Sequence, residues 1–384
     1  MKEPTASGDS PVVVALGTRP EAIKLAPVIL ALREHGINTL VLSTGQHREM
    51  LDQALEVFDI KPDRDYRLMR SEQSLAALSA AILFAVDETL RDVEPSWVLV
   101  QGDTTTVAMV SLAAFYRKIP VGHVEAGLRT HAKYDPFPEE MNRTLVGSLA
   151  DLHFAPTQGA CNDLLTQGVT RDRIHLVGNT VIDSLLNMRR RVSDQPLANF
   201  GLKTCPNRRI VLVTGHRREN FGDGMRGIFL GVRALAEEFR DQVEVICPVH
   251  LNPNVRGLVR ETLAGLENVQ LTDPLNYAAF VKVMTCAHFI ITDSGGVQEE
   301  AAALGVPLLV TRRTSERKEA IESGVAELVG TDPSKLVAAS RRLLARPDYY
   351  CSRAVATNAF GDGCSAERIA NIVARELRQT RDGT

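Results

Sequence analysis

The amino-acid sequence predicts an α/β protein built from two parallel β-sheets, each covered by helices on both faces. Short, near-continuous apolar segments alternate with stretches of helical periodicity, which is typical of parallel strands joined by crossover helices. The alternation runs in two series, separated by a polar stretch over residues 193–207. The chain has 384 residues, too many for one ordinary domain and suited to two.

The first series opens with the apolar strand Val12–Leu16, followed by a helix that starts near Pro20. Proline is favoured in the first helical turn because the N–H it lacks would have no partner there. Apolar residues from Leu75 to Leu90 recur at helical spacing and predict an amphipathic helix. Further strands of this series are expected at residues 40–42, 97–100, 120–124, 153–155 and 174–177.

The second series has the same pattern and is followed by a glycine-rich turn over residues 360–363. We place the N-terminal domain at residues 11–185 and the C-terminal domain at 186–362. A last helix within 363–384 could pack back on the N-terminal domain. Strands of the second series are expected at residues 210–213, 243–247, 269–271, 289–292 and 307–310.

The composition is that of a soluble globular protein, with 44% apolar and 24% charged residues. The net charge of -3 argues against nucleic acid or an anionic membrane as partner. Six cysteines without a C-x-x-C pair indicate reduced thiols, and their spacing predicts no metal site. We find no signal peptide and no apolar run of about 20 residues, so we expect a cytoplasmic protein.

Ligands of open α/β sheets bind beyond the carboxyl ends of the strands. The segment after the first strand begins with Gly17 and carries Arg19 and Lys24. A tight turn leading into a helix N-terminus suits an anion, and both cations would add to that attraction. The alternative interpretation is an ordinary helix start with an exposed arginine.

Carboxylates follow three further strands or loops of the first series, at Asp103, Glu125 and Glu139. Each has a structural alternative: Asp103 could cap the next helix, and Glu125 could be an ion-paired structural group. Glu139 and Glu140 could complement a helix dipole. Carboxylates at three neighbouring segments nevertheless favour proton transfer at carbon.

The second series places His216, His250 and the segment Ser294-Gly295-Gly296 directly after strands. The glycine-rich segment would expose backbone N–H groups at a helix start, which suits a diphosphate. Glu300 lies further along that helix, where a carboxylate can accept ribose hydroxyl hydrogen bonds. Either histidine alone would more often be structural.

Nine segments together resemble signature sequences of the non-hydrolysing UDP-N-acetylglucosamine (UDP-GlcNAc) 2-epimerases. They occur in the family's order and extend over most of the chain. The segments are GTRPEAIKLAPVI, TGQHREML, QGDTTT, GHVEAGLRT, PFPEEMNRT, GNTVID, TGHRREN, PVHLNP and DSGGVQEE.

The resemblance implies two Rossmann-like domains of the GT-B type, with the active site in the cleft between them. It implies interconversion of UDP-GlcNAc and UDP-N-acetylmannosamine (UDP-ManNAc). The reaction would pass through elimination of UDP to 2-acetamidoglucal and re-addition with C2 inverted. The family requires no metal or other cofactor and implies a homodimer.

The matching motifs carry the family's site residues onto this chain. The catalytic set is Asp103, Glu125, Glu139 and His216. The substrate-binding set is Arg19, Lys24, Arg143, Ser294, Gly295, Gly296 and Glu300. A second, activating UDP-GlcNAc site in bacterial members corresponds to Gln46, Glu49, Arg217 and His250.

The chain departs from the family pattern in its late loop and near the effector segment. Lys318 stands where the family has proline, Arg313 replaces an acidic residue, and Glu72 replaces an arginine of some regulated members. These changes leave open a modified UDP-N-acetylated sugar as substrate. A GT-B glycosyltransferase, a hydrolysing 2-epimerase and a non-catalytic nucleotide-sugar sensor are the alternative functions.

Overall fold

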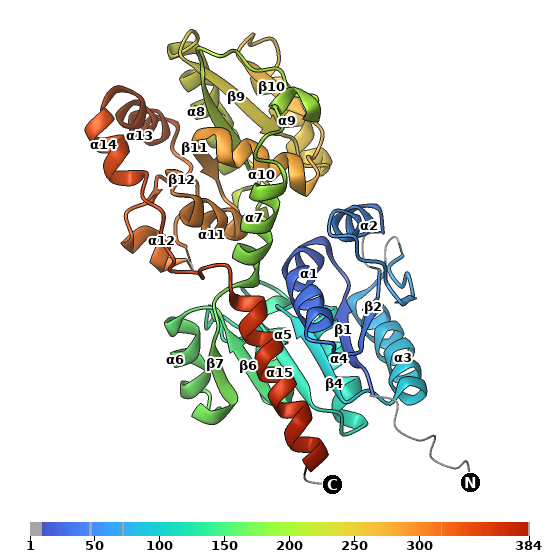
Figure 1. Ribbon diagram of the computed structural model, residues 1–384. Helices are drawn as coiled ribbons and strands as arrows, with labels where there is room; N and C mark the ends of the chain where they lie inside the picture. Colours follow the sequence, from blue (N-terminus) through green and yellow to red (C-terminus); the bar gives the residue numbers. More distant parts are fainter. Residues whose placement is uncertain (1–9, 46–47, 71–72, 316, 383–384) are drawn as a thin grey trace. The chain divides into compact units, whose positions relative to one another are not determined.

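The computed structural model describes residues 10–45, 48–70, 73–315 and 317–382, which form two compact units (Figure 1). The N-terminal unit comprises Met1–Ser184 together with Gly361–Thr384, and the C-terminal unit comprises Leu185–Phe360. The chain passes from one unit to the other within helix α7 (Thr180–Arg191). Each unit contains one parallel sheet with helices between its strands, which confirms the predicted α/β class.

The sheet of the N-terminal unit has seven strands in the order β3-β2-β1-β4-β5-β6-β7. The apolar strands fall where the sequence predicts them, and the central strands β1 and β4 are buried on both faces. The two-residue strand β3 was not predicted, since it is exposed and charged. The strands are β1 (Val12–Leu16), β2 (Thr39–Ser43), β3 (Arg64–Asp65), β4 (Trp97–Gln101), β5 (Val121–Val124), β6 (Leu152–Ala155) and β7 (Ile174–Leu176).

Helices α3, α4 and α5 pack on one apolar core with β1 and β4. In α3 the predicted stripe is buried except for Leu75, the exposed first residue. Helix α1 packs against α2 and α15. The helices are α1 (Arg19–Glu34), α2 (Arg48–Glu56), α3 (Leu75–Val93), α4 (Thr105–Tyr116), α5 (Glu139–Leu149), α6 (Gln158–Thr166) and α15 (Ser365–Asp382).

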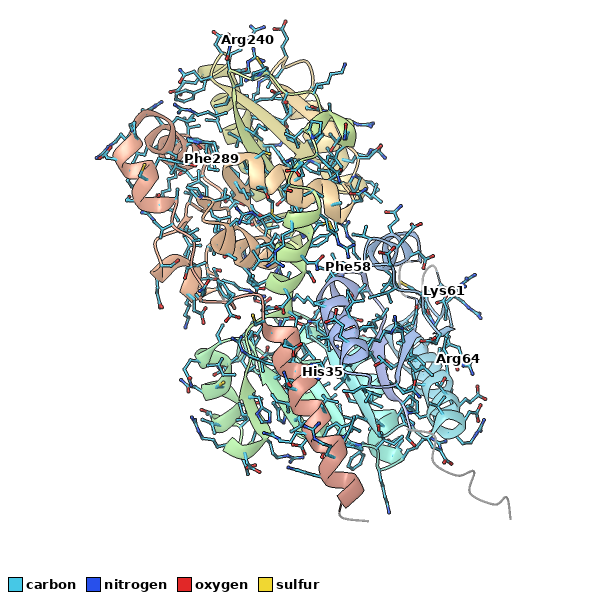
Figure 2. The ribbon with its side chains drawn as sticks, viewed as in Figure 1. His35, Phe58, Lys61, Arg64, Arg240 and Phe289 are labelled. Carbon is cyan, nitrogen blue, oxygen red and sulfur yellow. The ribbon has the colours of Figure 1, made fainter. Side chains whose placement is uncertain are left out.

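The last helix, α15, is fastened to the N-terminal unit at its start. The backbone N–H of Ala366 donates to Asp183 Oδ1 at 2.8 Å, and His35 Nε2 lies 2.8 Å from Glu367 Oε1. Figure 2 shows His35 beside α15. The chain therefore returns to its first unit after completing the second.

The sheet of the C-terminal unit has six strands in the order β10-β9-β8-β11-β12-β13. The short strand β13 was not predicted from the sequence. Phe289 on β11 is fully buried inside this unit (Figure 2). The strands are β8 (Arg209–Thr214), β9 (Val243–Pro248), β10 (Val269–Thr272), β11 (Ala287–Thr292), β12 (Leu308–Val310) and β13 (Ala326–Leu328).

Helices α8, α9 and α13 share an apolar core with β8, β9 and β11 in the C-terminal unit. The helices of this unit are α8 (Asp223–Glu238), α9 (Pro253–Leu263), α10 (Tyr277–Cys286), α11 (Gly295–Leu304), α12 (Lys318–Glu322), α13 (Pro333–Ala345) and α14 (Pro347–Arg353). Within the described part of the chain, no helix combines the length and apolarity needed to cross a bilayer.

Both sheets reverse their strand order at one point. In the N-terminal unit the reversal lies between β1 and β4, and in the C-terminal unit between β8 and β11. At such a switch point the connections leave toward opposite faces and open a crevice at the carboxyl ends of the strands. The segments after β1, β4, β8 and β11 are therefore the places to look for a site.

Candidate active site

The turn after β1 is held by buried polar contacts. A Cβ atom on Gly17 would lie 2.4 Å from the hydroxyl oxygens of Thr44 and Thr106, so this position requires glycine. Glu21 Oε2 accepts the N–H of Gly17 at 2.5 Å. Burial raises the pKa of Glu21 to about 7, although this hydrogen bond acts in the opposite direction. The turn brings Arg19 to the first position of α1.

The Glu125 carboxylate accepts from an ammonium group and from side-chain amides. Lys24 Nζ lies 2.6 Å and 2.7 Å from its two oxygens. Gln101 Nε2 donates to Oε2, and Asn179 Nδ2 donates to Oε1 at 2.9 Å. The structure thus brings two predicted residues, Lys24 and Glu125, into direct contact, with donors that stabilise the ionised carboxylate.

The backbone of Glu125 is strained. Its φ is +61°, in the left-handed region that non-glycine residues avoid at a cost of about 1 kcal/mol or more. Two residues on, Gly127 also has a positive φ, and a Cβ there would lie 2.3 Å from the carbonyl oxygen of Ala160. Strained residues held by their surroundings concentrate at functional sites, which supports a role for Glu125 beyond ion pairing.

Asp103 is paired with Arg143 on α5. The guanidinium donates to Asp103 Oδ2 from Nε at 3.0 Å and from Nη2 at 2.6 Å, and Asn142 Nδ2 donates to the carbonyl of Asp103 at 2.8 Å. The alternative that Asp103 caps the next helix is wrong, because the hydroxyl of Thr104 caps α4. Two more predicted residues, Asp103 and Arg143, are therefore brought together.

Glu139 and Glu140 begin α5 but differ in their hydrogen bonding. Glu140 accepts the backbone N–H groups of Thr130 and His131, each at 3.1 Å, and pairs with Arg143. Burial alone would raise the pKa of Glu140, but these donors outweigh it and the pKa is lowered. In contrast, Glu139 Oε2 is buried without a hydrogen-bond partner among the described residues. Glu140, and not Glu139, therefore holds the loop.

A buried histidine supports the turn after β4. His123 Nε2 lies 2.7 Å from the carbonyl oxygen of Gly102, to which it donates. Burial lowers the pKa of His123 to about 4, so its ring is neutral at pH 7. Because Gly102 has a φ of +84°, this bond fixes an unusual turn immediately before Asp103.

Two of the three predicted carboxylates, Glu125 and Asp103, follow the neighbouring strands β5 and β4. Glu125 Oε2 lies 3.7 Å from where a Cβ on Gly102 would stand, and Asp103 is the next residue. Arg143 then ties Asp103 to α5, whose first residue is Glu139. Segments far apart in sequence thus meet at the switch point.

In the C-terminal unit a fully buried aspartate organises the turn after β8. Asp293 accepts the backbone N–H of His216 at 3.1 Å and that of Arg217 at 3.0 Å. It also accepts Asn220 Nδ2 at 3.1 Å. The carboxylate therefore fixes the backbone that carries His216 and Arg217.

The rings of His216 and His250 are stacked, with centroids 5.4 Å apart and planes at 13°. His216 Nδ1 lies 3.7 Å from Asp293 Oδ1. Burial lowers the pKa of His216, and Asp293 opposes that effect. A neutral imidazole at this position can donate or accept a proton.

The start of α11 has the geometry predicted for an anion site. Ser294 is the N-cap, and Gly295 and Gly296 are the first two helical residues, whose N–H groups have no intrahelical partner. In the next turn Glu300 is buried, and its Oε1 accepts the hydroxyl of Tyr277 at 3.1 Å. These groups can bind a diphosphate and orient a carboxylate beside it.

Parts of the predicted effector site lie outside the described residues. This applies to Gln46 and to the neighbouring departure at Glu72, and Glu49 is described only as part of α2. In the late loop, Arg313 and Lys318 are exposed, whereas Arg317 is buried and pairs with Glu299 at 2.7 Å. Among the described residues, no three or more His, Cys, Asp or Glu side chains are grouped so that they could hold a metal ion.

Comparison with known proteins identifies the family of the chain. A family model described as UDP-N-acetylglucosamine 2-epimerase matches residues 30–374. The chain belongs to this family. The UDP-N-acetylglucosamine 2-epimerase of Salmonella typhimurium is 48% identical over 364 residues, covering 93% of this chain and 96% of the relative.

Solved structures extend this epimerase assignment to the fold. The crystal structure of UDP-GlcNAc 2-epimerase from Neisseria meningitidis bound to UDP-GlcNAc has a TM-score of 0.90 and 43% identity. The match covers 95% of this chain and 99% of that one. A glycosyltransferase of kitacinnamycin, 14% identical, has a TM-score of 0.64 over 96% of this chain, so the fold is GT-B-like.

Sequence reasoning missed the residues that hold the predicted groups in place. Gln101, His123 and Asn179 contact Glu125 or its neighbouring turn, and Asp293 holds the turn before Arg217. A signal for them existed, because all four lie within or directly beside the motif segments. Their residue types alone did not point to proton transfer or anion binding, so nothing singled them out.

Proposed function

We propose that this chain interconverts UDP-GlcNAc and UDP-ManNAc by elimination of UDP and re-addition with C2 inverted. The observation that carries the proposal is the way the predicted carboxylates of the N-terminal unit are held. Glu125 is bound by Lys24 and two amides, Asp103 is bound by Arg143, and Glu139 keeps a buried oxygen without a partner among the described residues.

The chemistry requires several acid–base groups. The C2 proton of the sugar is not adjacent to a ketone, so simple enolisation is not available. In the elimination a base removes this proton and a C1=C2 double bond forms. The C1–O bond breaks, and its electron pair leaves with the β-phosphate oxygen of UDP. Re-addition reverses these changes with the proton delivered to the opposite face of C2. Inversion therefore needs donors or acceptors on both faces.

We assign proton transfer and stabilisation of positive charge at the ring to Asp103, Glu125 and Glu139. Lys24 is paired with Glu125 and Arg143 with Asp103. We therefore assign to Lys24 and Arg143 the orientation of these two carboxylates as well as substrate binding. Arg19 follows the Gly17 turn and would bind the diphosphate together with His216. A neutral His216 can protonate the leaving phosphate oxygen or assist its return.

We assign UDP binding to the C-terminal unit. The N–H groups of Gly295 and Gly296 and the hydroxyl of Ser294 would bind the diphosphate at the start of α11, whereas the N–H of Ser294 donates to the hydroxyl of Thr292. Glu300 would accept the ribose hydroxyls, with Tyr277 fixing its orientation. No metal or other cofactor enters this scheme.

We further propose that His250 and Arg217, with Gln46 and Glu49, bind a second, activating UDP-GlcNAc. Two features support the assignment. The ring of His250 stacks on that of His216. The backbone N–H groups of Arg217 and His216 both donate to the Asp293 carboxylate. A ligand that moved either group would therefore act directly on His216.

A homodimer is the proposed assembly. Phe84 on α3 and the neighbours Phe115 and Tyr116 on α4 are 73%, 57% and 63% exposed, on helices that pack together. Exposed aromatic clusters mark association surfaces. Light scattering should report a dimer for the wild type, and Phe115→Ser with Tyr116→Ser should yield monomer. Leu328→Ser, at an exposed apolar residue of the other unit, should stay dimeric.

Proton NMR of the protein with UDP-GlcNAc in deuterated water tests the proposed function. We expect UDP-ManNAc to appear without any acceptor, with deuterium at C2 of both sugars. Free ManNAc with UDP would instead identify a hydrolysing enzyme. No reaction without an acceptor would favour a glycosyltransferase, and turnover of only a deoxy or uronic relative would identify a modified substrate.

A further inference from the structure

The side chain of Asn179 joins the start of α7 to the Glu125 carboxylate. Asn179 is 1% exposed. Its Oδ1 accepts the backbone N–H of Val181 at 3.2 Å, and its Nδ2 donates to Glu125 Oε1 at 2.9 Å. Only the amide oxygen can accept from a backbone N–H, so this bond fixes the amide with its nitrogen toward Glu125.

The two amides around Glu125 divide its oxygens between them. Gln101 donates to Oε2 and Asn179 donates to Oε1, while Lys24 Nζ contacts both. Gln101 is the last residue of β4, which pairs with β5, so the pairing of the two strands fixes the position of Gln101 beside Glu125. Asn179 lies 54 residues after Glu125 in the sequence, so its position does not depend on the pairing of β4 with β5.

The backbone of Asn179 is itself closely packed. A Cβ on Gly361 would lie 3.3 Å from its N atom and 3.5 Å from its O atom. Gly361 has a φ of +136° and belongs to the same unit. The turn before α15 therefore packs closely on the backbone of Asn179, and the bond from Val181 orients its side-chain amide.

We propose that Asn179 is a positioning residue that keeps the Glu125 carboxylate ionised and correctly oriented for proton transfer. This inference rests on the proposed function, in which Glu125 is an acid–base group. A neutral amide donor suits that task, because it favours the carboxylate without adding a second titrating group.

Other charged or titratable groups also face Glu125. Lys24 contacts it from α1, and His123 on β5 interacts electrostatically with both Glu125 and Asp103. His123 is neutral above about pH 5, because burial lowers its pKa to about 4. Asp103 is paired with Arg143, whereas Lys24 contacts both oxygens of Glu125. A new carboxylate at position 179 would oppose the stabilising effect of this positive charge.

Asn179→Asp is the decisive variant, because aspartate keeps the cap on Val181 while replacing the donor with an anion. Two carboxylates this close share a proton, which raises their pKa. We expect the acid limb of the kcat/KM profile to move up by one pH unit or more. Asn179→Ser keeps a capping oxygen and loses the donor, so kcat should fall roughly 10- to 100-fold with KM little changed.

Asn268 is a matched control. It is 2% exposed and donates to the carbonyls of Ala236 and Val243 in the C-terminal unit. Asn268→Asp and Asn268→Ser should lower the melting temperature without moving the pH profile. A structural role for Asn179 would give the same result at both positions.

A second readout separates this inference from the proposed function. In protein labelled with 13C at the glutamate carboxyls, the Glu125 resonance is assigned by its loss in Glu125→Gln and titrated in wild type and Asn179→Asp. A higher midpoint in Asn179→Asp supports positioning even if the wild type does not epimerise UDP-GlcNAc, which would refute the function alone. Unchanged titration and an unchanged pH profile in an active enzyme would overturn the inference. If Asn179→Asp does not fold, an Asn179→Ser variant with wild-type kcat would overturn it.

Discussion

The two sheets of this protein have different functional groups at their switch points. At the N-terminal switch point, charged side chains from distant segments pair with one another, as in Lys24 with Glu125 and Arg143 with Asp103. At the C-terminal switch point, the buried Asp293 holds backbone N–H groups and the helix α11 begins with glycines. The first arrangement suits transfer of protons, and the second suits binding of an anion. One fold thus supports two tasks through the residues that follow its strands.

The largest expected effect is a loss of epimerisation without a loss of UDP binding, which separates proton transfer from anion binding. Asp103→Asn and Glu139→Gln should each lower epimerisation about 10²- to 10⁴-fold, because a neutral amide cannot exchange the proton. UDP affinity should stay within a few-fold of wild type, as measured by calorimetry.

Glu140→Gln is the comparison for Glu139→Gln, because Glu140 holds the Thr130–His131 backbone and Arg143. It should lower the melting temperature, while Glu139→Gln should leave it unchanged. Equal losses of UDP binding and turnover in Glu139→Gln would contradict the assignment of proton transfer to the N-terminal unit and of UDP binding to the C-terminal unit.

A smaller effect is expected at Asp293. Replacement by alanine would leave the N–H groups of His216 and Arg217 without their buried acceptor, at a cost of roughly 2–3 kcal/mol. UDP affinity should fall about 10- to 100-fold, and urea denaturation should show the loss of stability. Asp223→Ala, at the exposed start of α8 in the same unit, is the control and should change neither quantity appreciably.

The third effect concerns pH. The pKa of Glu21 is raised from 4.5 to about 7, so between these values the folded state keeps a proton that the unfolded state has lost. Stability from this group is therefore present below about pH 4.5, falls as pH rises to about 7 and is constant above. The total change is roughly 3 kcal/mol at most.

Glu21→Gln removes this titration. The difference in unfolding free energy between wild type and Glu21→Gln should change from pH 5 to pH 8 in favour of the variant. Glu88→Gln, at an exposed position of α3, is the control for removal of one carboxylate. Parallel stability curves for wild type and Glu21→Gln would show that burial of Glu21 is not the controlling factor.

The smallest effect is expected at Lys318. It is exposed and is the first residue of α12, a position where proline is tolerated. Lys318→Pro should change stability by less than about 1 kcal/mol and leave the preferred sugar unchanged. A shift in sugar preference, measured as relative kcat/KM, would give this departure a role in specificity.

The sequence predicted the strands that have a continuous apolar signal, and it failed where that signal was missing. Strand β1 lies at the expected residues, whereas the exposed strand β3 and the three-residue strand β13 carry no continuous apolar signal. Turn chemistry was also ambiguous. Asp103 and Thr104 are both good helix caps, and only the structure shows that Thr104 fills that role.

At the candidate site, residue types were visible from the sequence but their partners were not. Lys24 and Glu125 are 101 residues apart, and no local pattern predicts that they touch. The contrast between Glu139 and Glu140 is equally hidden, because both are glutamates at the start of one helix. Only tertiary contacts decide which of the two has its oxygens occupied.

The fate of the C2 proton tests the central claim most directly. With UDP-GlcNAc in deuterated water, wild-type protein should place deuterium at C2 as it forms UDP-ManNAc. The Asp103→Asn protein should bind UDP yet incorporate no deuterium. Epimerisation by the wild type with the original proton retained at C2, or exchange by Asp103→Asn at the wild-type rate, would contradict proton transfer by the carboxylates of the N-terminal unit.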